Sequence, residues 1–231
     1  MKYEGRARRA GLKLILITLL LVLAFGIGGI LATMVGTFMA ALTPALFVVW
    51  LVFALFTLYF FRDPTPQGPS DSRAIVAPAY GKVDVIDEVD EPNVIGGRCK
   101  RVSIFLSVVD VHVQYAPISG KITYLKHTAG KFLNAMKAET CAYNENVLLG
   151  FEPVEFPEEK IAVRLLAGLI ARRIVPYVAH GDLLQRGERI SLIQFGSRCD
   201  LYLPMKCEVQ VKLGDKVVGG ETLVARYPSE K

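Results

Sequence analysis

Histidine and cysteine, the side chains that most often bind zinc, are scarce here: 231 residues contain three histidines and four cysteines. The cysteines form no Cys-x-x-Cys pair and none has a histidine beside it, so the spacing argues against a zinc site. They stand at positions 99, 141, 199 and 207. We therefore predict no metal centre.

Charge is absent from residues 14–61. A helix needs about 20 apolar residues to cross a bilayer, so this segment is long enough for two spans, which we place at residues 14–33 and 45–61. Gly36 and Thr43-Pro44 fall in the turn expected between them. A cleavable signal peptide is the competing interpretation, but it would have one short apolar core and no second span.

Positive charge is concentrated at the N-terminus. The net charge is +5, and residues 1–13 hold five of the basic residues against Glu4 alone. They are Lys2, Arg6, Arg8, Arg9 and Lys13. The rest of the chain is nearly balanced, so no nucleic-acid partner is predicted. Basic residues beside a span mark the cytoplasmic side and suit a contact with anionic lipid, and Arg62 closes the second span in the same way.

This pattern predicts a basic cytoplasmic N-terminus (residues 1–13), a transmembrane hairpin (14–61) in the cell (inner) membrane, and a main domain on the cytoplasmic face. A cytoplasmic domain also predicts that the cysteines are free thiols.

Long segments of helical periodicity are missing after residue 61, apart from a short helix expected near residues 168–174. A Pro- and Gly-rich linker at 62–73 precedes short runs in which apolar and polar residues alternate, as in strands. Glycine turns such as those in "KLGDKVVGGETLVA" are typical of lipoyl and biotin carriers. We predict a mainly β domain at 74–231, a flattened β-sandwich with lipoyl/biotin-carrier-like hairpins. The expected strands are 74–77, 82–86, 101–106, 121–125, 147–151, 161–166, 190–195, 199–203, 208–213 and 222–226.

A carrier would also need a modifiable lysine at a hairpin tip, and "PMKCE" offers Lys206. Too few residues separate Glu208 from the Gly214-Asp215 turn for the strands that normally intervene. Lys206 is therefore interpreted as a surface lysine.

The segment "IQFGSRCDLY" (residues 193–202) has the flanks of a single strand, yet Gly196-Ser197 interrupts it. Glycine weakens a strand because it packs no side chain. A bulge or a close backbone approach is the structural explanation, and chemistry at the serine is the other. Phe195 is expected to line a pocket or pack in the core.

Three histidines can be weighed individually. His127 lies between lysines on an expected turn, and His180 precedes a Gly-Asp turn, so both are interpreted as structural or solvated. His112 follows an apolar run and would share a strand face with Asp110 at period two. A lone strand histidine is usually structural, but these two features favour a functional role for His112.

Four segments carry a resemblance to a known family: "SIFLSVVDVHVQYAPISGKI", "AGKFLNAMKAETCAYNENVLL", "GDLLQRGERISLIQFGSRCDLYLP" and "VKLGDKVVGGETLVA". In this order they resemble consecutive blocks of the short (archaeal-type) subfamily of the pyruvoyl-dependent phosphatidylserine decarboxylases. "FFRDPTP" after the hairpin is similar to the family's anchor. The resemblance runs from about Phe60 to Arg226, so it does not depend on Gly-Ser alone.

The resemblance implies that the chain cuts its own Gly196–Ser197 bond. Ser197 Oγ would attack the Gly196 carbonyl, where no Cβ hinders it, and elimination would leave a pyruvoyl group at position 197. The products would be a β-chain (1–196) and an α-chain (197–231) that stay paired. The pyruvoyl group would form a Schiff base with phosphatidylserine in the membrane and accept electrons as CO₂ leaves, giving phosphatidylethanolamine. No metal or diffusible cofactor is implied.

The same resemblance assigns His112 as general base for Ser197 and as proton donor to the product, tasks that suit an unperturbed pKa near ~6.5. Asn144-Glu145 matches a pair near the family's site. Gln114-Tyr115 stands where basic or histidine residues are common, a difference that would affect head-group contacts.

One departure concerns the family's usual Pro-Ala-Asp-Gly, which is Pro78-Ala79-Tyr80-Gly81 here. The phenol of Tyr80, with an ordinary pKa of ~10, can orient a base but is uncharged near neutrality. Either another carboxylate replaces the aspartate (Asp84, Asp110 or Glu145), or tyrosine suffices, or the chain matures poorly.

The sequence thus predicts a membrane-associated, self-processing carboxy-lyase. The alternative is a membrane-tethered β-sandwich adaptor or carrier, or an unprocessed pseudoenzyme, which Tyr80 would favour. By analogy with other β-sandwich domains that have exposed edges, a homodimer is also expected.

Overall fold

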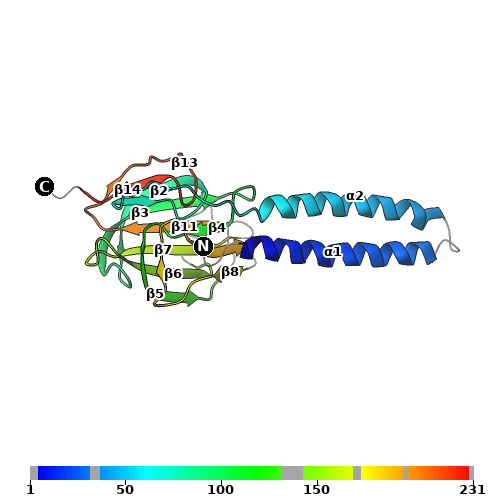
Figure 1. Cartoon of the computed structure of the whole chain (residues 1–231), viewed down its shortest axis with the longest axis horizontal. Helices are drawn as coiled ribbons and strands as arrows, with labels where there is room; N and C mark the ends of the chain where they lie inside the picture. Colours follow the sequence, from blue (N-terminus) through cyan, green and yellow to red (C-terminus); the bar gives the residue numbers. More distant parts are fainter. Residues whose placement is uncertain (1–4, 32–36, 132–142, 169–172, 195–196, 229–231) are drawn as a thin grey trace. The chain divides into compact units, whose positions relative to one another are not determined.

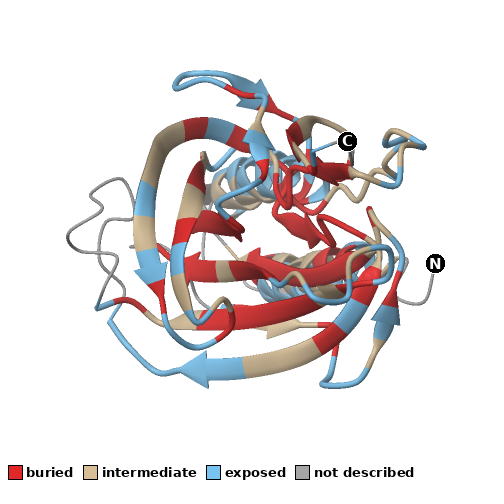
Figure 2. Cartoon of the chain, turned by 90° about the vertical axis from the view of Figure 1, so that its left-hand side faces the viewer, coloured by how far each residue is buried: buried red, intermediate tan, exposed pale blue. Residues whose placement is uncertain are grey.

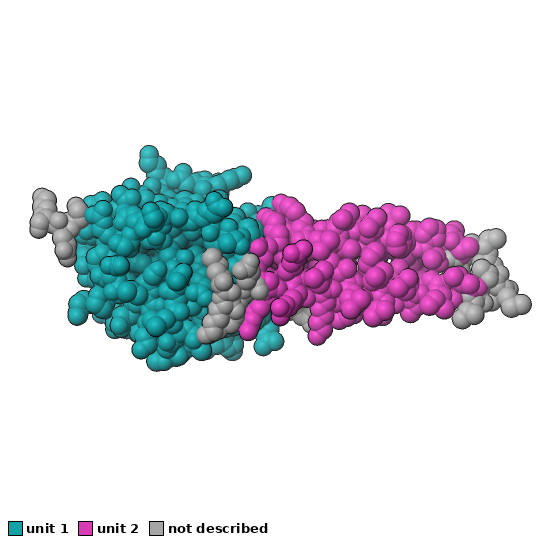
Figure 3. Space-filling view, viewed as in Figure 1, with its two compact units in different colours: residues 1–3, 64–231 teal, residues 4–63 magenta. Residues whose placement is uncertain are grey.

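The computed structural model describes residues 5–31, 37–131, 143–168, 173–194 and 197–228. Both helices and most of the strands are labelled in Figure 1. The chain divides into two compact units, one made of Glu4–Asp63 and the other of Pro64–Lys231 with Met1–Tyr3 (Figure 3).

The first unit is a pair of apolar helices, α1 (Arg6–Leu31) and α2 (Thr37–Phe60). Arg6–Ile30 and Ala40–Phe60 are long and apolar enough to cross a membrane. Within the pair, the Trp50 indole N–H donates to Thr18 Oγ1 at 3.1 Å. Two expectations are corrected. Four residues of the basic cluster lie within α1 rather than before it, and Pro44 lies inside α2 rather than in a turn, a position that membrane helices tolerate.

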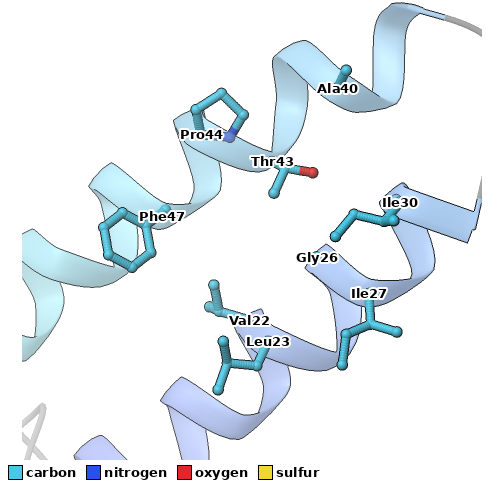
Figure 4. A pocket seen from close by; sticks show the side chains of 10 residues that line it. Val22, Leu23, Gly26, Ile27, Ile30, Ala40, Thr43, Pro44 and Phe47 are labelled. Carbon is cyan, nitrogen blue, oxygen red and sulfur yellow. The ribbon is translucent and has the colours of Figure 1, made fainter. Parts of the chain in front are cut away.

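An apolar cavity of about 530 Å³ lies between these helices beside Pro44 (Figure 4). Small residues leave this space open: a Cβ added to Gly26 would meet only Thr43 Cγ2, at 3.7 Å. The lining carries no ionisable side chain, so this cavity is not a candidate for catalysis.

The second unit is built of antiparallel strands, and the mainly β class predicted from the sequence is confirmed. Among the described residues, the strands form three sheets with orders β1-β14-β12, β4-β10-β8 and β13-β2-β3-β11-β7-β6-β5-β9. The bounds are β1 Ala74–Val76, β2 Gly81–Glu91, β3 Gly97–Leu106, β4 Val113–Tyr115, β5 Gly120–Thr128, β6 Asn146–Pro153, β7 Ile161–Ala167, β8 Arg173–Pro176, β9 Leu183–Leu184, β10 Arg189–Gln194, β11 Ser197–Leu203, β12 Glu208–Val209, β13 Lys216–Val217 and β14 Leu223–Arg226.

One apolar core joins all three sheets. It includes Ile75 of β1, Ile193 of β10 and Leu201 of β11, all fully buried. The eight-stranded sheet curves strongly, and buried residues concentrate in its middle strands while the outer strands are more exposed (Figure 2). The two small sheets contribute to the same core, so burial drives all three to pack together.

The segment predicted to be one interrupted strand is two strands in different sheets. Residues 189–194 form β10 of the β4-β10-β8 sheet, and β11 begins at Ser197 in the large sheet. The chain therefore passes from one sheet to another at the Gly-Ser position. Of the short helix predicted near 168–174, residues 169–172 lie outside the described part, and Arg173 begins β8.

Residues 64–73, which we call the strap, are bound to the β domain. The Arg189 guanidinium and the Tyr115 hydroxyl both donate to the Pro64 carbonyl, each at 3.3 Å. Arg186 donates to the carbonyls of Pro69, Asp71 and Ala74, the latter two at 2.5 and 2.9 Å. Burial lowers the pKa of Arg186 below its ordinary value. These bonds fix the segment that was predicted to be a linker.

Candidate active site

Ser197 is the first residue of β11, the strand between β3 and β7 (Figure 1). It pairs with Leu106 on one side and Ala167 on the other. Its side chain is fully buried, and within the described part of the chain its Oγ has no hydrogen-bond partner. A buried hydroxyl without a partner costs about 1–3 kcal/mol. Such a cost at this position marks Ser197 as a candidate functional residue.

The residue before Ser197 is not described. Phe195 and Gly196, both named in the sequence analysis, lie outside the described residues. Their neighbours are nevertheless fixed in separate sheets, because Gln194 pairs with Arg173 of β8 and Ser197 pairs with β3 and β7. The Gly196–Ser197 bond therefore belongs to the two-residue connection between sheets.

His112 is buried beside β10. Its carbonyl accepts a hydrogen bond from Ile193 N–H at 3.1 Å. Its Nδ1 lies 2.8 Å from the Asp110 carbonyl oxygen. Because a carbonyl can only accept, Nδ1 must carry the proton, and the neutral ring then presents Nε2 as its acceptor nitrogen. This is the tautomer a general base needs.

The predicted relation between His112 and Asp110 is wrong. The strand ends at Leu106, and residues 107–112 form a turn, so the two side chains do not share a strand face. The Asp110 carboxylate accepts hydrogen bonds from the Ser107 backbone N–H and hydroxyl at 2.8 and 2.7 Å. It therefore closes the turn, and it is the Asp110 backbone that contacts the imidazole.

Gln114 was not predicted as a positioning residue, and it is fully buried. Its amide nitrogen donates to the His112 carbonyl at 2.7 Å, and its amide oxygen accepts from the Ser191 hydroxyl at 2.6 Å. These bonds connect the His112 segment to β10. They use the Gln114 side chain inside the fold, and the effect on head-group contacts expected from the sequence stays a prediction.

Asn144 and Glu145 reach the site through Ala167, the register partner of Ser197. The Asn144 side-chain amide donates to the Ala167 carbonyl at 2.8 Å, and Ala167 N–H donates to the Glu145 carbonyl at 3.0 Å. The Glu145 carboxylate lies 3.2 Å from His127 Nε2. The pair therefore lies beside β7, on the opposite side of Ser197 from β3.

Tyr80 lies next to β4, the strand that follows His112. Its ring packs on Tyr115, with centroids 6.1 Å apart, and Tyr115 N–H donates to the Pro78 carbonyl at 2.8 Å. A Cβ at Gly219 would come within 2.9 Å of the Tyr80 ring. The structure thus brings Tyr80 to the strand beside His112.

Known proteins are similar to this chain over most of its length. A profile described as phosphatidylserine decarboxylase matches residues 53–225. The phosphatidylserine decarboxylase proenzyme of Symbiobacterium thermophilum is 44% identical over 200 residues, which cover 84% of this chain and 92% of the relative. The proenzyme of Desulfotalea psychrophila is 44% identical over 178 residues (77% and 82%), and that of Geobacter metallireducens 40% over 204 (87% and 92%).

The chain belongs to the phosphatidylserine decarboxylase family. The resemblance inferred from the four sequence segments is thereby confirmed. The family model matches residues 53–225, a range that includes every candidate site residue from Tyr80 to Ser197.

Arg198 and two carboxylates form a cluster of ion pairs on the face of β11 opposite the Ser197 side chain. The buried Arg198 guanidinium binds Asp84 at 2.8 Å and Asp200 at 3.2 Å. Burial raises the pKa of Asp84, although Arg198 counteracts the shift. Since neighbouring strand residues point to opposite faces, Asp84 is engaged away from the Ser197 side chain.

Three cysteines of the described residues are free and buried: Cys99, Cys199 and Cys207. Burial raises the pKa of Cys99 to about 11 and that of Cys207 to about 12, so these thiols are poor nucleophiles at neutral pH. Cys141 lies outside the described residues. Within the described residues, no group of three or more His, Cys, Asp or Glu side chains is placed to hold a metal ion.

Proposed function

We propose that this chain is a proenzyme that cuts itself at Gly196–Ser197 and then decarboxylates phosphatidylserine to phosphatidylethanolamine. The observation that carries the proposal is the buried Ser197 hydroxyl, which has no described hydrogen-bond partner and stands where the chain passes between two sheets. Membership in the decarboxylase family gives this serine its chemistry.

Self-cleavage begins with Ser197. Its Oγ attacks the Gly196 carbonyl carbon, the hydroxyl proton passes to His112 Nε2, and the peptide C–N bond breaks as its nitrogen takes up a proton. The amide is thereby exchanged for an ester. Loss of the Ser197 Cα proton with cleavage of the Cβ–Oγ bond then releases Gly196 as a carboxylate. Water then replaces the backbone nitrogen of residue 197, and this nitrogen leaves as ammonia.

Three hydrogen bonds position His112 for this role. The Asp110 carbonyl fixes the Nδ1–H tautomer, and the Ile193 N–H and the Gln114 amide both hold the His112 backbone. In the precursor Ser197 Oγ makes no described hydrogen bond, so the imidazole and the hydroxyl must approach each other before the proton moves. Catalytic hydrogen bonds often tighten only when the reacting geometry forms.

The buried, orphaned side chain of Ser197 fits the precursor of a pyruvoyl group. That group supplies an electron-accepting carbonyl, which takes the place of pyridoxal phosphate in amino-acid decarboxylation. Its surroundings on the core face of β11 are apolar, with Cys199 and Leu201 following on the same face. His112 donates a proton to the decarboxylated carbon, and Asn144 holds the Ala167 strand in register beside the site.

The two chains remain together after the cut because the α-chain supplies strands to the β-chain's sheets. β11 pairs on both sides with β3 and β7, β13 pairs with β2, and β14 pairs with β1. All of these partner strands precede residue 196. The fold therefore needs no covalent link at Gly196–Ser197.

The two apolar helices favour membrane association, as a lipid substrate requires. We place the protein in the inner membrane with its β domain on the cytoplasmic face, because the basic residues lie at the start of α1 and after α2. A homodimer stays a prediction. The alternative of an adaptor or a pseudoenzyme is not favoured, since the curated relatives are named as proenzymes of the decarboxylase.

A denaturing gel of the purified full chain tests the proposal. The wild type should separate into two fragments, one of residues 1–196 and one of residues 197–231. Ser197→Ala should stay intact and folded. Ser103→Ala, which removes another buried serine hydroxyl without a described partner, on β3, is the matched control and should still be cut. Cleavage of Ser197→Ala at the same position would show that the assigned nucleophile is wrong.

A further inference from the structure

Exposed apolar side chains lie at the end of the large sheet where Ser197 begins β11. Val108 and Val109, 38% and 57% exposed, form the tip of the turn that leads from β3 to His112. Tyr143, 66% exposed, directly precedes Asn144. Single exposed apolar residues are ordinary on a protein surface, so exposure alone does not mark these three as a binding surface.

These side chains flank the candidate active site on two sides. The valine tip begins two residues after Leu106, which pairs with Ser197 on β3. Tyr143 is joined by Asn144 to Ala167, which pairs with Ser197 on β7. The same register therefore places apolar surface on either side of Ser197.

Two exposed cations lie at the same end of the domain. Lys131 N–H donates to the Tyr143 carbonyl at 2.7 Å, and Arg173 is the register partner of Gln194 at the end of β10. The two nearby carboxylates have partners of their own, since Asp110 binds Ser107 and Glu145 binds His127. The surface thus combines apolar and basic groups.

The strap shows where the chain that follows α2 enters the β domain. Pro64 follows the last residue of α2 by four positions, and its carbonyl is bound by Tyr115 of β4 and by Arg189 of β10. Tyr115 is three residues from His112, a strand distance of about 10 Å. The chain therefore enters the β domain close to the candidate active site.

We infer that Val108, Val109, Tyr143, Lys131 and Arg173 form a bilayer-docking surface beside the active site, which we call the docking rim. The valines and the tyrosine ring enter the interfacial layer, where such side chains are stabilised, and the two cations contact lipid phosphates. Docking lets the head group of a lipid reach residue 197 while the acyl chains stay in the bilayer. The inference rests on the proposed function, which requires a lipid substrate.

The test compares two forms of the substrate with the full mature chain reconstituted in phosphatidylcholine vesicles. Phosphatidylserine is supplied either as a long-chain lipid of the same bilayer or as a short-chain monomer in water. Val109→Asp should lower the ratio of the long-chain rate to the short-chain rate about tenfold, because burying a valine is worth about that factor. An unchanged ratio would overturn the inference.

Matched controls come from the opposite end of the sheet. Val154 and Leu183 are 62% and 74% exposed, and they lie beside the Gly120 end of β5, far along the strands from Ser197 in register. Val154→Asp and Leu183→Asp should leave the ratio unchanged. If they lower it as much as Val109→Asp does, the effect is not one of the docking rim and the inference fails.

A measurement without turnover separates this inference from the proposed function. Trp50 is the single tryptophan, so Val109→Trp in a Trp50→Phe background carries one reporter. Lipids with brominated acyl chains should quench it at least twofold more than Val154→Trp in the same background, because only the rim enters the interface. Equal quenching would overturn docking. A wild type that turns over neither substrate would instead contradict the proposed function, and the quenching would still decide docking.

Discussion

The side-chain amide of Asn144 donates a hydrogen bond of 2.8 Å to the carbonyl of Ala167, the residue that faces Ser197 across β7 and β11. This bond attaches an irregular segment to the strand beside the proposed nucleophile. Asn144→Ala should therefore slow self-cleavage about tenfold or more, and leave the buried Ala167 carbonyl without this donor at a cost of about 1–3 kcal/mol.

The rate is read from the disappearance of full-length chain on a denaturing gel. Asn93→Ala is the matched control, because the Asn93 amide binds Glu91 in the β2–β3 hairpin rather than the site. Equal cleavage rates for Asn144→Ala and Asn93→Ala would contradict the role given to Asn144.

Gln114 connects the His112 carbonyl to Ser191, so the two polar side chains should be energetically coupled. We expect Gln114→Leu and Ser191→Ala, made in the uncleaved Ser197→Ala chain, each to lower the free energy of unfolding by about 1–3 kcal/mol. The double change should cost less than the sum, because either single change already breaks the shared bond. Denaturant unfolding in detergent measures the cycle, and strict additivity would refute the connection.

Tyr80 stands where the sequence resemblance implies an aspartate, and its ring lies against Tyr115. We propose that its phenol helps to orient His112 during self-cleavage. Tyr80→Phe keeps the ring packing and should slow cleavage about tenfold, a modest loss within the range for assisting acid–base groups.

The control for this change is Tyr115→Phe. It removes the hydroxyl that binds Pro64 of the strap, and cleavage should continue at the wild-type rate. If Tyr80→Phe also cleaves at that rate, the ring alone matters and the phenol has no part in maturation.

Glu91 gives the β domain a predictable sensitivity to acid. Burial raises the pKa of its carboxyl group, but hydrogen bonds from the N–H groups of Ile95 and Val94 and from Asn93 lower it by more, so the net pKa is below its ordinary value. A lowered pKa means that ionised Glu91 stabilises the fold above the unfolded-state value of ~4.3. This contribution is lost as the pH falls through the folded-state pKa.

Hydrogen exchange of the hairpin around residues 92–96 measures this contribution. Protection in the wild type should fall between about pH 6 and about pH 3 by more than in Glu91→Gln, which has no charge to lose. A fall of the same size in both proteins would show that Glu91 does not contribute.

The features predictable from sequence were the local ones. Alternation identified strands of the large sheet such as β3, in which Val102, Ile104 and Leu106 are buried on one face. The charge-free run identified both long helices. Pro44 was misplaced because proline usually ends a helix in water, whereas a membrane helix tolerates it.

The non-local features could not be read from the sequence. Apolar and polar residues alternate on both sides of Gly196-Ser197 as they would in a single strand, and nothing local shows that β10 and β11 join different sheets. His112 was placed on a strand because Ser107–Asp110 side-chain bonds that close the turn leave no periodic signal. The roles of Gln114 and Ala167 depend on pairing between strands distant in sequence, which composition does not encode.

Intact mass spectrometry of the purified mature protein tests the central claim most directly. We expect two masses, one for residues 1–196 ending in a carboxylate and one for residues 197–231 that is lighter by one ammonia than a chain with an N-terminal serine. The smaller chain should also react with a carbonyl reagent. A single mass for the uncut chain, or a smaller chain that begins with an amino-terminal Ser197, would contradict the account.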